Sequence, residues 1–340
     1  MGLIDINKQL EKERGFIPPV LRQNIVTGDW IVIAPGRARR PDDFIHPKSE
    51  PTKQKTECPF CVGSKGFKQQ KVLSNHGNIY TIENKFPAFY EKNTGTRSYY
   101  PEDGFYRERP SIGSHEVVII KDHNASLTKF SKTLTSELFL VILERYRKIK
   151  EDDQVFSITP IYNHGAEAGA SIDHPHAQIF ASGIIANTVN REMDGAERYF
   201  SVNGICVFCD IIKHERAEKT RVVYENEYFL AFAPYASRYP FESWVIPKRH
   251  KSQFEKSSEN EINEFADATN EVLTRLEKIL PGLSLNMYIR TLPTTLESSD
   301  YYHWYLEIAP RLTTFGGFEM GSGVIINVIP PEIATEYLKN

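Results

Sequence analysis

The stretch SIDHPHAQIFA, residues 171–181, carries two histidines separated by a single proline, with a glutamine two residues further on. In an extended chain successive side chains point to opposite faces of the sheet, so His174, His176 and Gln178 share one face. The preceding segment NHGAEAGA, residues 163–170, is rich in glycine and alanine and lets a ligand approach the backbone closely. One face of this strand therefore offers three polar groups that can bind a metal, attack phosphorus or donate hydrogen bonds.

The order of motifs repeats in the second half of the chain. The spacing between the two histidines that follow each cysteine pair in this order is nearly the same in both halves, with 51 residues from His123 to His174 and 53 from His250 to His303. The first half contains CPFC (58–61), ENKFPAFY (83–90), GSHEVVIIKDH (113–123) and the stretch quoted above, and the second contains CVFCDII (206–212), ENEYFLAFAPY (225–235), YPFESWVIPKRH (239–250) and SDYYHWYLEIAP (299–310). This repeat indicates an internal duplication.

Each half supplies a Cys-x-x-Cys motif and two distant histidines, which make a complete tetrahedral set for a structural zinc ion. The predicted ligands are Cys58, Cys61, His123 and His174 in the first half and Cys206, Cys209, His250 and His303 in the second. A thioredoxin-like redox pair is the alternative for the cysteines, and His123 and His250 could instead simply end strands. Two sets in the same order favour metal ligation, so we expect about two zinc ions per chain. Ligand types alone do not separate zinc from iron, although thiolates favour zinc.

Short segments rich in β-branched and aromatic residues predict strands, and two longer segments with helical apolar spacing predict helices. The predicted strands are residues 29–35, 115–121, 155–162, 176–183, 228–235, 243–248, 285–291 and 303–310. The predicted helices are residues 133–152 and 259–280, the second with Ser257 and Ser258 as candidate caps. This pattern predicts an α+β fold of two antiparallel-sheet halves, residues 1–190 and 191–340, each with one long helix.

The two halves differ at the positions that carry chemistry. Aligning the fourth segments places His174 on His303, whereas His176 and Gln178 meet Tyr305 and Glu307. His174 therefore belongs to the metal set, and His176 is free to act as a nucleophile toward phosphorus. Gln178 could donate to a phosphoryl oxygen as charge develops there. The alternative is that His176 is a packed strand histidine, which the glycine-rich surroundings disfavour.

A group of arginines, Arg37, Arg39 and Arg40, follows the predicted strand at residues 29–35. The planar guanidinium binds phosphate oxygens in a bidentate manner, so Arg37 and Arg40 make a candidate clamp for a diphosphate. Arginine clusters are also common on solvated surfaces. This interpretation of the arginines as a clamp is supported only if they lie beside a histidine that attacks phosphorus.

The bulk composition limits the classes of function. The 340-residue chain has a net charge of −3 and a pI near 6.4, and it contains no dense Lys/Arg block. Since this balance gives no general attraction for polyanions, we expect no nucleic-acid partner. The sequence has no apolar run of about 18 residues and begins with a charged stretch, so we expect no membrane span, no secretion signal and a cytoplasmic location.

Together these motifs resemble the galactose-1-phosphate uridylyltransferase family of the histidine triad superfamily. The resemblance covers nearly the whole chain, and its most specific part is Asn-x-Gly followed by Gly-x-Ser-x-x-His-Pro-His-x-Gln, residues 163–178. It implies a duplicated histidine-triad-like fold, a homodimer, zinc at the first tetrad and a ping-pong reaction in which His176 takes a nucleoside monophosphate from a nucleotide sugar. The substrate-binding positions that it implies are Arg37, Arg40, Asn84, Asn163, Ser171, Phe318 and Glu319, with Gln178 contacting the phosphates beside the nucleophile.

The resemblance implies UDP-glucose and galactose 1-phosphate as substrates, giving glucose 1-phosphate and UDP-galactose. Two features instead resemble the related ADP-glucose phosphorylases, which transfer an adenylyl group to phosphate: the second cysteine pair, with His303 followed by Trp-Tyr, and the loop TTFGGFEMG at residues 313–321. A nucleotide-binding or regulatory protein without turnover is a further alternative, which the pairing of His176 with Gln178 disfavours. Two zinc ribbons that bind nucleic acid would conflict with the negative net charge.

Overall fold

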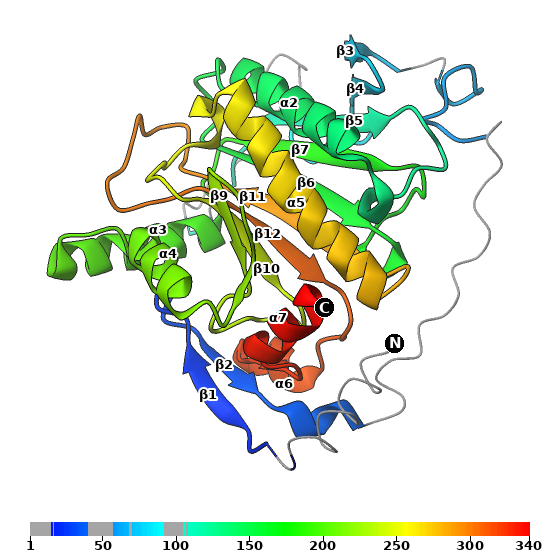
Figure 1. Cartoon of the computed structure of the whole chain (residues 1–340). Helices are drawn as coiled ribbons and strands as arrows, with labels where there is room; N and C mark the ends of the chain where they lie inside the picture. Colours follow the sequence, from blue (N-terminus) through cyan, green and yellow to red (C-terminus); the bar gives the residue numbers. More distant parts are fainter. Residues whose placement is uncertain (1–14, 16, 40–56, 68–69, 92–104, 107) are drawn as a thin grey trace.

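A ten-stranded antiparallel sheet forms the centre of the protein (Figure 1), with strand order β3-β4-β5-β7-β6-β11-β12-β10-β9-β8. The computed structural model describes residues 15, 17–39, 57–67, 70–91, 105–106 and 108–340. The strands of this sheet are β3 (Val72–His76), β4 (Ile79–Glu83), β5 (Gly113–Ile120), β6 (Ser157–His164), β7 (His176–Ser182), β8 (Val222–Glu225), β9 (Phe229–Phe232), β10 (Ser243–Pro247), β11 (Leu285–Arg290) and β12 (Tyr305–Pro310). The order within the first half is repeated in the second, running inward from the other edge.

The two halves meet where β6 pairs with β11. The strands are antiparallel, with Leu285 opposite His164 and Tyr288 opposite Ile161. This pairing satisfies backbone groups that would be exposed if either strand stood at an edge. The α+β fold class is thus confirmed, with the two antiparallel halves joined into one sheet. The expected boundary between residues 190 and 191 lies within α3 (Asn187–Asn203), and the division into two domains stays a prediction.

The two long helices, α2 (Lys132–Ile149) and α5 (Glu259–Ile279), lie side by side over one face of the sheet (Figure 1). The Ser131 side chain accepts a hydrogen bond from the Leu134 amide at the start of α2. At the start of α5, Ser258 and Glu261 form a capping box, so Ser258 is the cap of the two expected serines.

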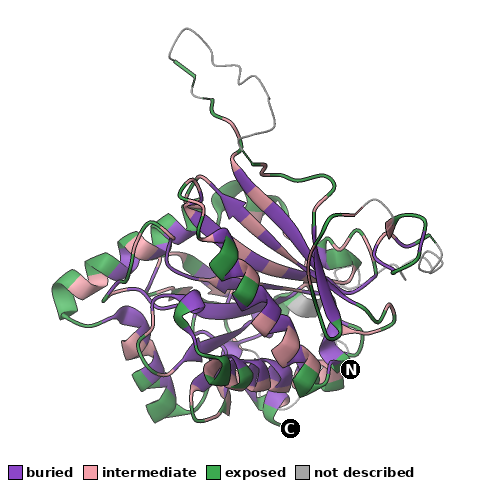
Figure 2. Cartoon of the chain, turned by 90° about the horizontal axis from the view of Figure 1, so that it is seen from above, coloured by how far each residue is buried: buried purple, intermediate pink, exposed green. Residues whose placement is uncertain are grey.

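Alternation along the strands divides the sheet into a helix face and an open face. Val118 and Ile120 of β5 join Ile179 of β7 in the core beneath α2 and α5. Val117 and Ile119 point the other way and pack with the segment that contains the first cysteine pair. Figure 2 shows that the strands are mostly buried, whereas the outer helices mix buried and exposed residues. The two long helices therefore cover one face, and the sites described below lie on the other, which in the second half packs against residues 193–212.

Every strand and helix expected from the sequence is present, and the structure adds shorter or more polar elements. A separate three-stranded sheet contains β1 (Val20–Gln23), β2 (Trp30–Ile33) and β13 (Ile325–Asn327). The added helices are α3, α4 (Val207–Glu218), α6 (Gly317–Ser322) and α7 (Pro331–Lys339), and the added strands of the large sheet are β3, β4 and β8. Their apolar runs are too short for periodicity alone to identify them. Within the described ranges, no helix has the length and apolar character needed to cross a membrane.

Phe265 of α5 links the packing of the two halves, and we expect its removal to destabilise both. Its buried ring lies 4.5 Å from that of Phe139 in α2 and 5.1 Å from that of Trp304, measured between centroids. Phe265→Ala leaves a cavity there and should lower the free energy of unfolding by about 3–5 kcal/mol in urea denaturation. The control is Val202→Ala, at a side chain that is 84% exposed, which should leave stability unchanged. An unshifted unfolding midpoint for Phe265→Ala would contradict this account of the core.

Candidate active site and metal centres

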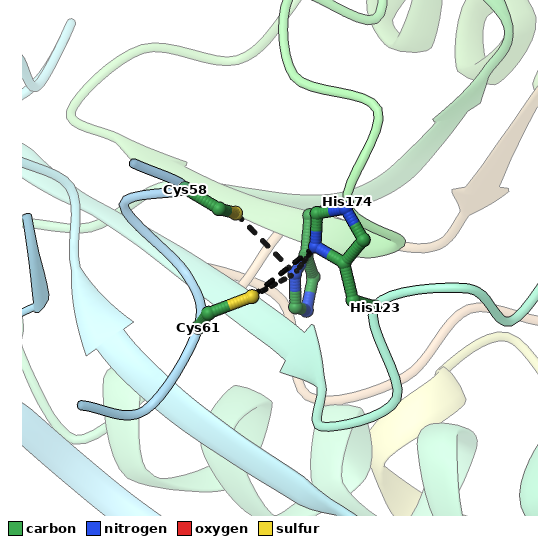
Figure 3. A group of neighbouring side chains, drawn as sticks. All are labelled: Cys58, Cys61, His123 and His174. Carbon is green, nitrogen blue, oxygen red and sulfur yellow. Dashed lines mark hydrogen bonds between the residues drawn. The ribbon is translucent and has the colours of Figure 1, made fainter. Parts of the chain in front are cut away.

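The first cysteine and histidine set comes together at one end of the open face. His123 follows β5 and His174 precedes β7, and because these strands are antiparallel neighbours the two histidines meet. Their Nδ1 atoms are 3.0 Å apart. The Sγ atom of Cys58 lies 3.5 Å from Nδ1 of His174, and that of Cys61 lies 3.2 Å from Nδ1 of His123 (Figure 3).

These distances are close to those around a tetrahedral metal ion. Zn–N and Zn–S bonds of about 2.0–2.3 Å at tetrahedral angles give ligand-to-ligand separations of roughly 3.3–3.8 Å. The 3.5 Å separation lies in this range, and the 3.0 and 3.2 Å separations are slightly shorter. The Nε2–H of His174 donates to the carbonyl of Ile120 at 2.6 Å, which leaves Nδ1 as the ligand atom. Burial lowers the pKa of His174 to about 4, so its ring is neutral, as a metal ligand must be.

The second set has the same construction. Cys206 precedes α4, Cys209 lies in its first turn, and Nδ1 of both His250 and His303 faces the Cys209 sulfur, at 3.4 and 3.8 Å. The Nε2 atoms of the histidines donate to backbone carbonyls, His250 to Ser299 and His303 to Pro247, each at 2.9 Å. In both halves the four ligand atoms lie within 4.8 Å of one another, so each set could hold a metal ion.

The geometry of the cysteine pairs also bears on the redox alternative. Cys206 does stand at a helix N-terminus, where a thioredoxin-like pair would be placed. However, none of the four cysteines is in a disulfide, and each pair is faced by two histidines. Backbone carbonyls fix the ring orientation of His174, His250 and His303. The arrangement fits metal ligation better than disulfide exchange.

His176 is the first residue of β7, and its ring orientation is suited to nucleophilic attack. Its Nδ1–H donates to the carbonyl of His174 at 2.7 Å, so the lone pair is on Nε2. Burial lowers the pKa of His176, which favours the neutral ring. Phe60 packs against that ring, with centroids 5.1 Å apart. In the described part of the chain no hydrogen-bond partner occupies Nε2, which a packed structural histidine would be expected to have.

Three further expected site residues lie on the same face as His176. Gln178 is two residues along β7, and its Oε1 lies 2.9 Å from Nε2 of His115 in β5. Asn84 follows β4, and its Nδ2 lies 3.1 Å from the same His115 nitrogen. Asn163 is on β6 one residue beyond the pair formed by Tyr162 and Ala177, and therefore next to His176. His115 was not among the expected site residues, because only the strand register places it beside Gln178.

The glycine-rich loop before β7 has a backbone conformation in which residues other than glycine would be strained. Gly165 and Gly169 have φ angles of 83° and 80°, in the left-handed region. A Cβ atom on Gly165 would lie 2.1 Å from Oγ of Ser284, so the loop can approach β11 only with glycine there. Ser171 is exposed in this loop, between the 3₁₀ turn η5 (Ala166–Ala168) and β7.

Three other expected substrate residues, Arg37, Phe318 and Glu319, are not brought to His176 within one chain. Arg37 lies in the 3₁₀ turn η1 (Pro35–Arg39) after β2, and Phe318 and Glu319 lie in α6. In Figure 1 β2 and α6 occupy the opposite end of the molecule from β7. Arg37 and Phe318 are exposed, while Glu319 caps its own helix by accepting from the Gly316 amide at 3.0 Å. Arg40 lies outside the described residues.

The second half keeps its cysteine and histidine set but has no histidine at the position of His176. Tyr305 stands at the position of His176, and its hydroxyl donates to Glu192 of α3 at 3.2 Å. Glu307 stands at the position of Gln178, is 1% exposed and pairs with Arg238. The cavity left beside these groups is about 20 Å³, too small for a nucleotide. At the positions of His176 and Gln178 the second half therefore has paired groups and no room for a nucleotide.

Comparison with known proteins agrees with this architecture. The N-terminal domain model of galactose-1-phosphate uridyl transferase matches residues 10–186, and the C-terminal domain model matches residues 192–307. An ADP-glucose phosphorylase of Arabidopsis thaliana is 32% identical over 94% of this chain and 92% of its own length. A galactose-1-phosphate uridylyltransferase of Thermotoga maritima is 29% identical over 94% of this chain and 97% of its own.

Solved structures give the same result. The crystal structure of an Arabidopsis thaliana ADP-glucose phosphorylase with bound ADP-glucose superposes with a TM-score of 0.80 at 30% identity, covering 95% of this chain and 98% of that one. A uridylyltransferase structure superposes with a TM-score of 0.74 at 23% identity over 94% of this chain and 97% of that one, which shows a common fold. The chain therefore belongs to the galactose-1-phosphate uridylyltransferase family of nucleotidyltransferases.

Proposed function

We propose that this protein transfers a nucleoside monophosphate between phosphorylated acceptors through a covalent intermediate on His176. The observation that carries the proposal is the fixed ring of His176, whose Nδ1–H is held by the His174 carbonyl so that Nε2 is the nucleophile. The carboxamides of Gln178 and Asn163 on the same face are suited to donate to phosphoryl oxygens.

In the first step Nε2 of His176 attacks the α-phosphorus of a nucleotide sugar. The P–N bond forms as the bond from the α-phosphorus to the bridging oxygen breaks, and the sugar 1-phosphate leaves with that electron pair. The positive charge on the ring is stabilised by the Nδ1–H···O hydrogen bond to His174. In the second step an acceptor phosphate oxygen attacks the same phosphorus and the P–N bond breaks, which restores the free histidine.

UDP-glucose and galactose 1-phosphate are the first candidate substrates, supported by the family and by the uridylyltransferase of Thermotoga maritima. The second candidate pair is ADP-glucose and inorganic phosphate. It is supported by the similarity to the Arabidopsis thaliana ADP-glucose phosphorylase. The crystal structure of that enzyme, which contains bound ADP-glucose, superposes on this chain. The proposed chemistry at His176 is common to both pairs.

Labelling in a single turnover tests this proposal and separates the two substrate pairs. With label in the α-phosphate, UDP-glucose should leave acid-labile label on the protein that galactose 1-phosphate removes, and ADP-glucose with phosphate is the parallel assay. His176→Ala should abolish the label, whereas Gln178→Ala should slow its appearance by roughly 10²–10³-fold, as expected for loss of one oxyanion donor. Label that persists on His176→Ala would exclude His176 as the nucleophile.

We also propose that both tetrads hold zinc in a structural role. Each site has four protein ligands and no open position, so zinc would fix the chain segments that carry its ligands and would not act on substrate. In the first half this means that zinc would hold His174, and with it the start of β7.

Elemental analysis of purified protein should give about two zinc ions per chain. Cys209→Ser should retain about one, because the two tetrads share no ligand. His176→Ala should retain both, since His176 is not part of either tetrad and its Nδ1–H is used by the His174 carbonyl. Zinc loss in His176→Ala would contradict the separation of roles between His174 and His176.

The positions of Arg37, Phe318 and Glu319 support a homodimer as the active form. If these residues bind substrate, a second chain has to supply them, because each chain places them away from its own His176. A twofold interface would then complete both sites at once.

Complementation between two inactive chains tests this arrangement. His176→Ala and Glu319→Ala should each be inactive alone, and co-expression with separate affinity tags should restore about a quarter of the wild-type rate through random pairing. As the control for mixing, a chain that carries both substitutions is paired with a wild-type chain. Lack of recovery in a purified mixed dimer would show that Glu319 does not act across the interface.

A further inference from the structure

His115 is a buried histidine that the proposed mechanism does not use, and its ring is firmly placed. It lies on the open face of β5 with 5% of its surface exposed. Phe180 of β7 is directly opposite, and the two rings stack with centroids 3.9 Å apart and an interplanar angle of 28°. Register and stacking together fix where the two ring nitrogens point.

The surroundings of the ring select one tautomer. The backbone N–H of Ala88 points at Nδ1 from 3.4 Å, so Nδ1 is the acceptor and Nε2 carries the hydrogen. Burial lowers the pKa of His115, in keeping with a neutral ring. The Nε2–H then donates to Oε1 of Gln178 at 2.9 Å.

The side chain of Asn84 also approaches Nε2, at 3.1 Å through its Nδ2 atom. An imidazole nitrogen that donates cannot also accept, so only one of the two contacts is a hydrogen bond. The Ala88 amide decides in favour of Gln178. Asn84 is held by its own oxygen, which accepts from the Phe86 amide at 2.9 Å, and its NH₂ group is left beside the ring.

Occupation of Oε1 by His115 determines which end of the Gln178 carboxamide is available. With the oxygen engaged, the NH₂ end is the part left to contact a ligand. If the carboxamide rotated by half a turn, its oxygen would face the phosphoryl oxygens and repel them. The two orientations have nearly the same shape, so a hydrogen-bond partner is needed to select one.

The same arrangement occurs independently at Asn163. Its Oδ1 accepts from Nδ2 of Asn286 at 2.8 Å, and Asn286 also donates to the carbonyl of Ala168 in the glycine-rich loop at 2.8 Å. Asn286 belongs to β11 of the second half. Both carboxamides beside His176 thus have their oxygen held by protein, which leaves both NH₂ groups for an anionic ligand.

We propose that His115 is a positioning residue that holds the carboxamide of Gln178 with its NH₂ group toward the α-phosphate. The inference rests on the proposed function, because the phosphate is the substrate's, although the hydrogen bond itself is a property of the free protein. His115 touches no reacting atom and acts only through Gln178.

The test compares two replacements with opposite properties. His115→Phe keeps a ring to stack on Phe180 but removes the donor, whereas His115→Gln keeps an N–H donor near the position of Nε2. We expect His115→Phe to slow the single-turnover labelling of His176 by roughly 10- to 100-fold, the usual loss when a partner that orients a functional group is removed. KM for the nucleotide sugar should change little, and His115→Gln should recover most of the rate.

A double-mutant cycle with Gln178→Ala isolates the coupling. In that background His115→Phe should cause no further loss, since the group that it orients is already absent. Equal labelling rates for wild type and His115→Phe, or an undiminished loss in the Gln178→Ala background, would overturn the proposal. Thermal unfolding and zinc content of each variant control for damage to the fold.

A measurement without substrate keeps this inference separate from the proposed function. In protein labelled with ¹⁵N at histidine and glutamine, NMR should show His115 with its hydrogen on Nε2, and the Gln178 side-chain amide signals should shift in His115→Phe. A hydrogen on Nδ1 of His115 would overturn the positioning role whatever the activity. Absence of label on wild type from both nucleotide sugars, with the Nε2 tautomer present, would instead refute only the proposed reaction.

Discussion

The antiparallel pairing of β5 with β7 is the contact on which the first-half sites depend. It brings His123 from the end of one strand to His174 at the start of the other, and the same register sets His115 opposite Phe180 and two pairs away from Gln178, on the same face. A slip of one residue would turn every side chain of the shifted strand to the other face. The hydrophobic residues between these positions prevent that slip, because Val118 and Ile179 must remain beneath the helices.

The position of the first tetrad and that of His176 are therefore two consequences of one register. Nδ1 of His174 faces the Cys58 sulfur, while the His174 carbonyl accepts from Nδ1 of His176. A zinc ion at the end of the strand would fix the backbone to which His176 is hydrogen-bonded. In the proposed reaction, a closed structural metal site would then affect catalysis without touching substrate.

The second half retains the cysteine and histidine set of the duplication but not the residues at the positions of His176 and Gln178. Its metal set is complete, but the face that corresponds to the active site is filled by charged groups that neutralise one another. Glu307 pairs with Arg238, and Arg290 lies within 3.7 Å of Glu192 from α3. Charges buried to this extent are tolerated only when they are paired, and here the pairing also excludes a ligand. The second half still contributes to the first, since Asn286 crosses the shared sheet to hold Asn163.

The sequence by itself identified the residue types that carry chemistry: the two tetrads, the free His176 with Gln178, and the strands and long helices around them. These predictions follow from local patterns, because the ligand types, their repeated order and the apolar periodicity can be read directly from the sequence. Only the tertiary structure decided which residues meet across strands, as with His115 beside Gln178 and Asn286 beside Asn163. It also placed Arg37, Phe318 and Glu319 at the opposite end of the molecule from His176, although the family resemblance assigns all four residues to one site. Strand register and the joining of the two halves depend on contacts between residues far apart in sequence. The local pattern of one sequence does not specify these contacts.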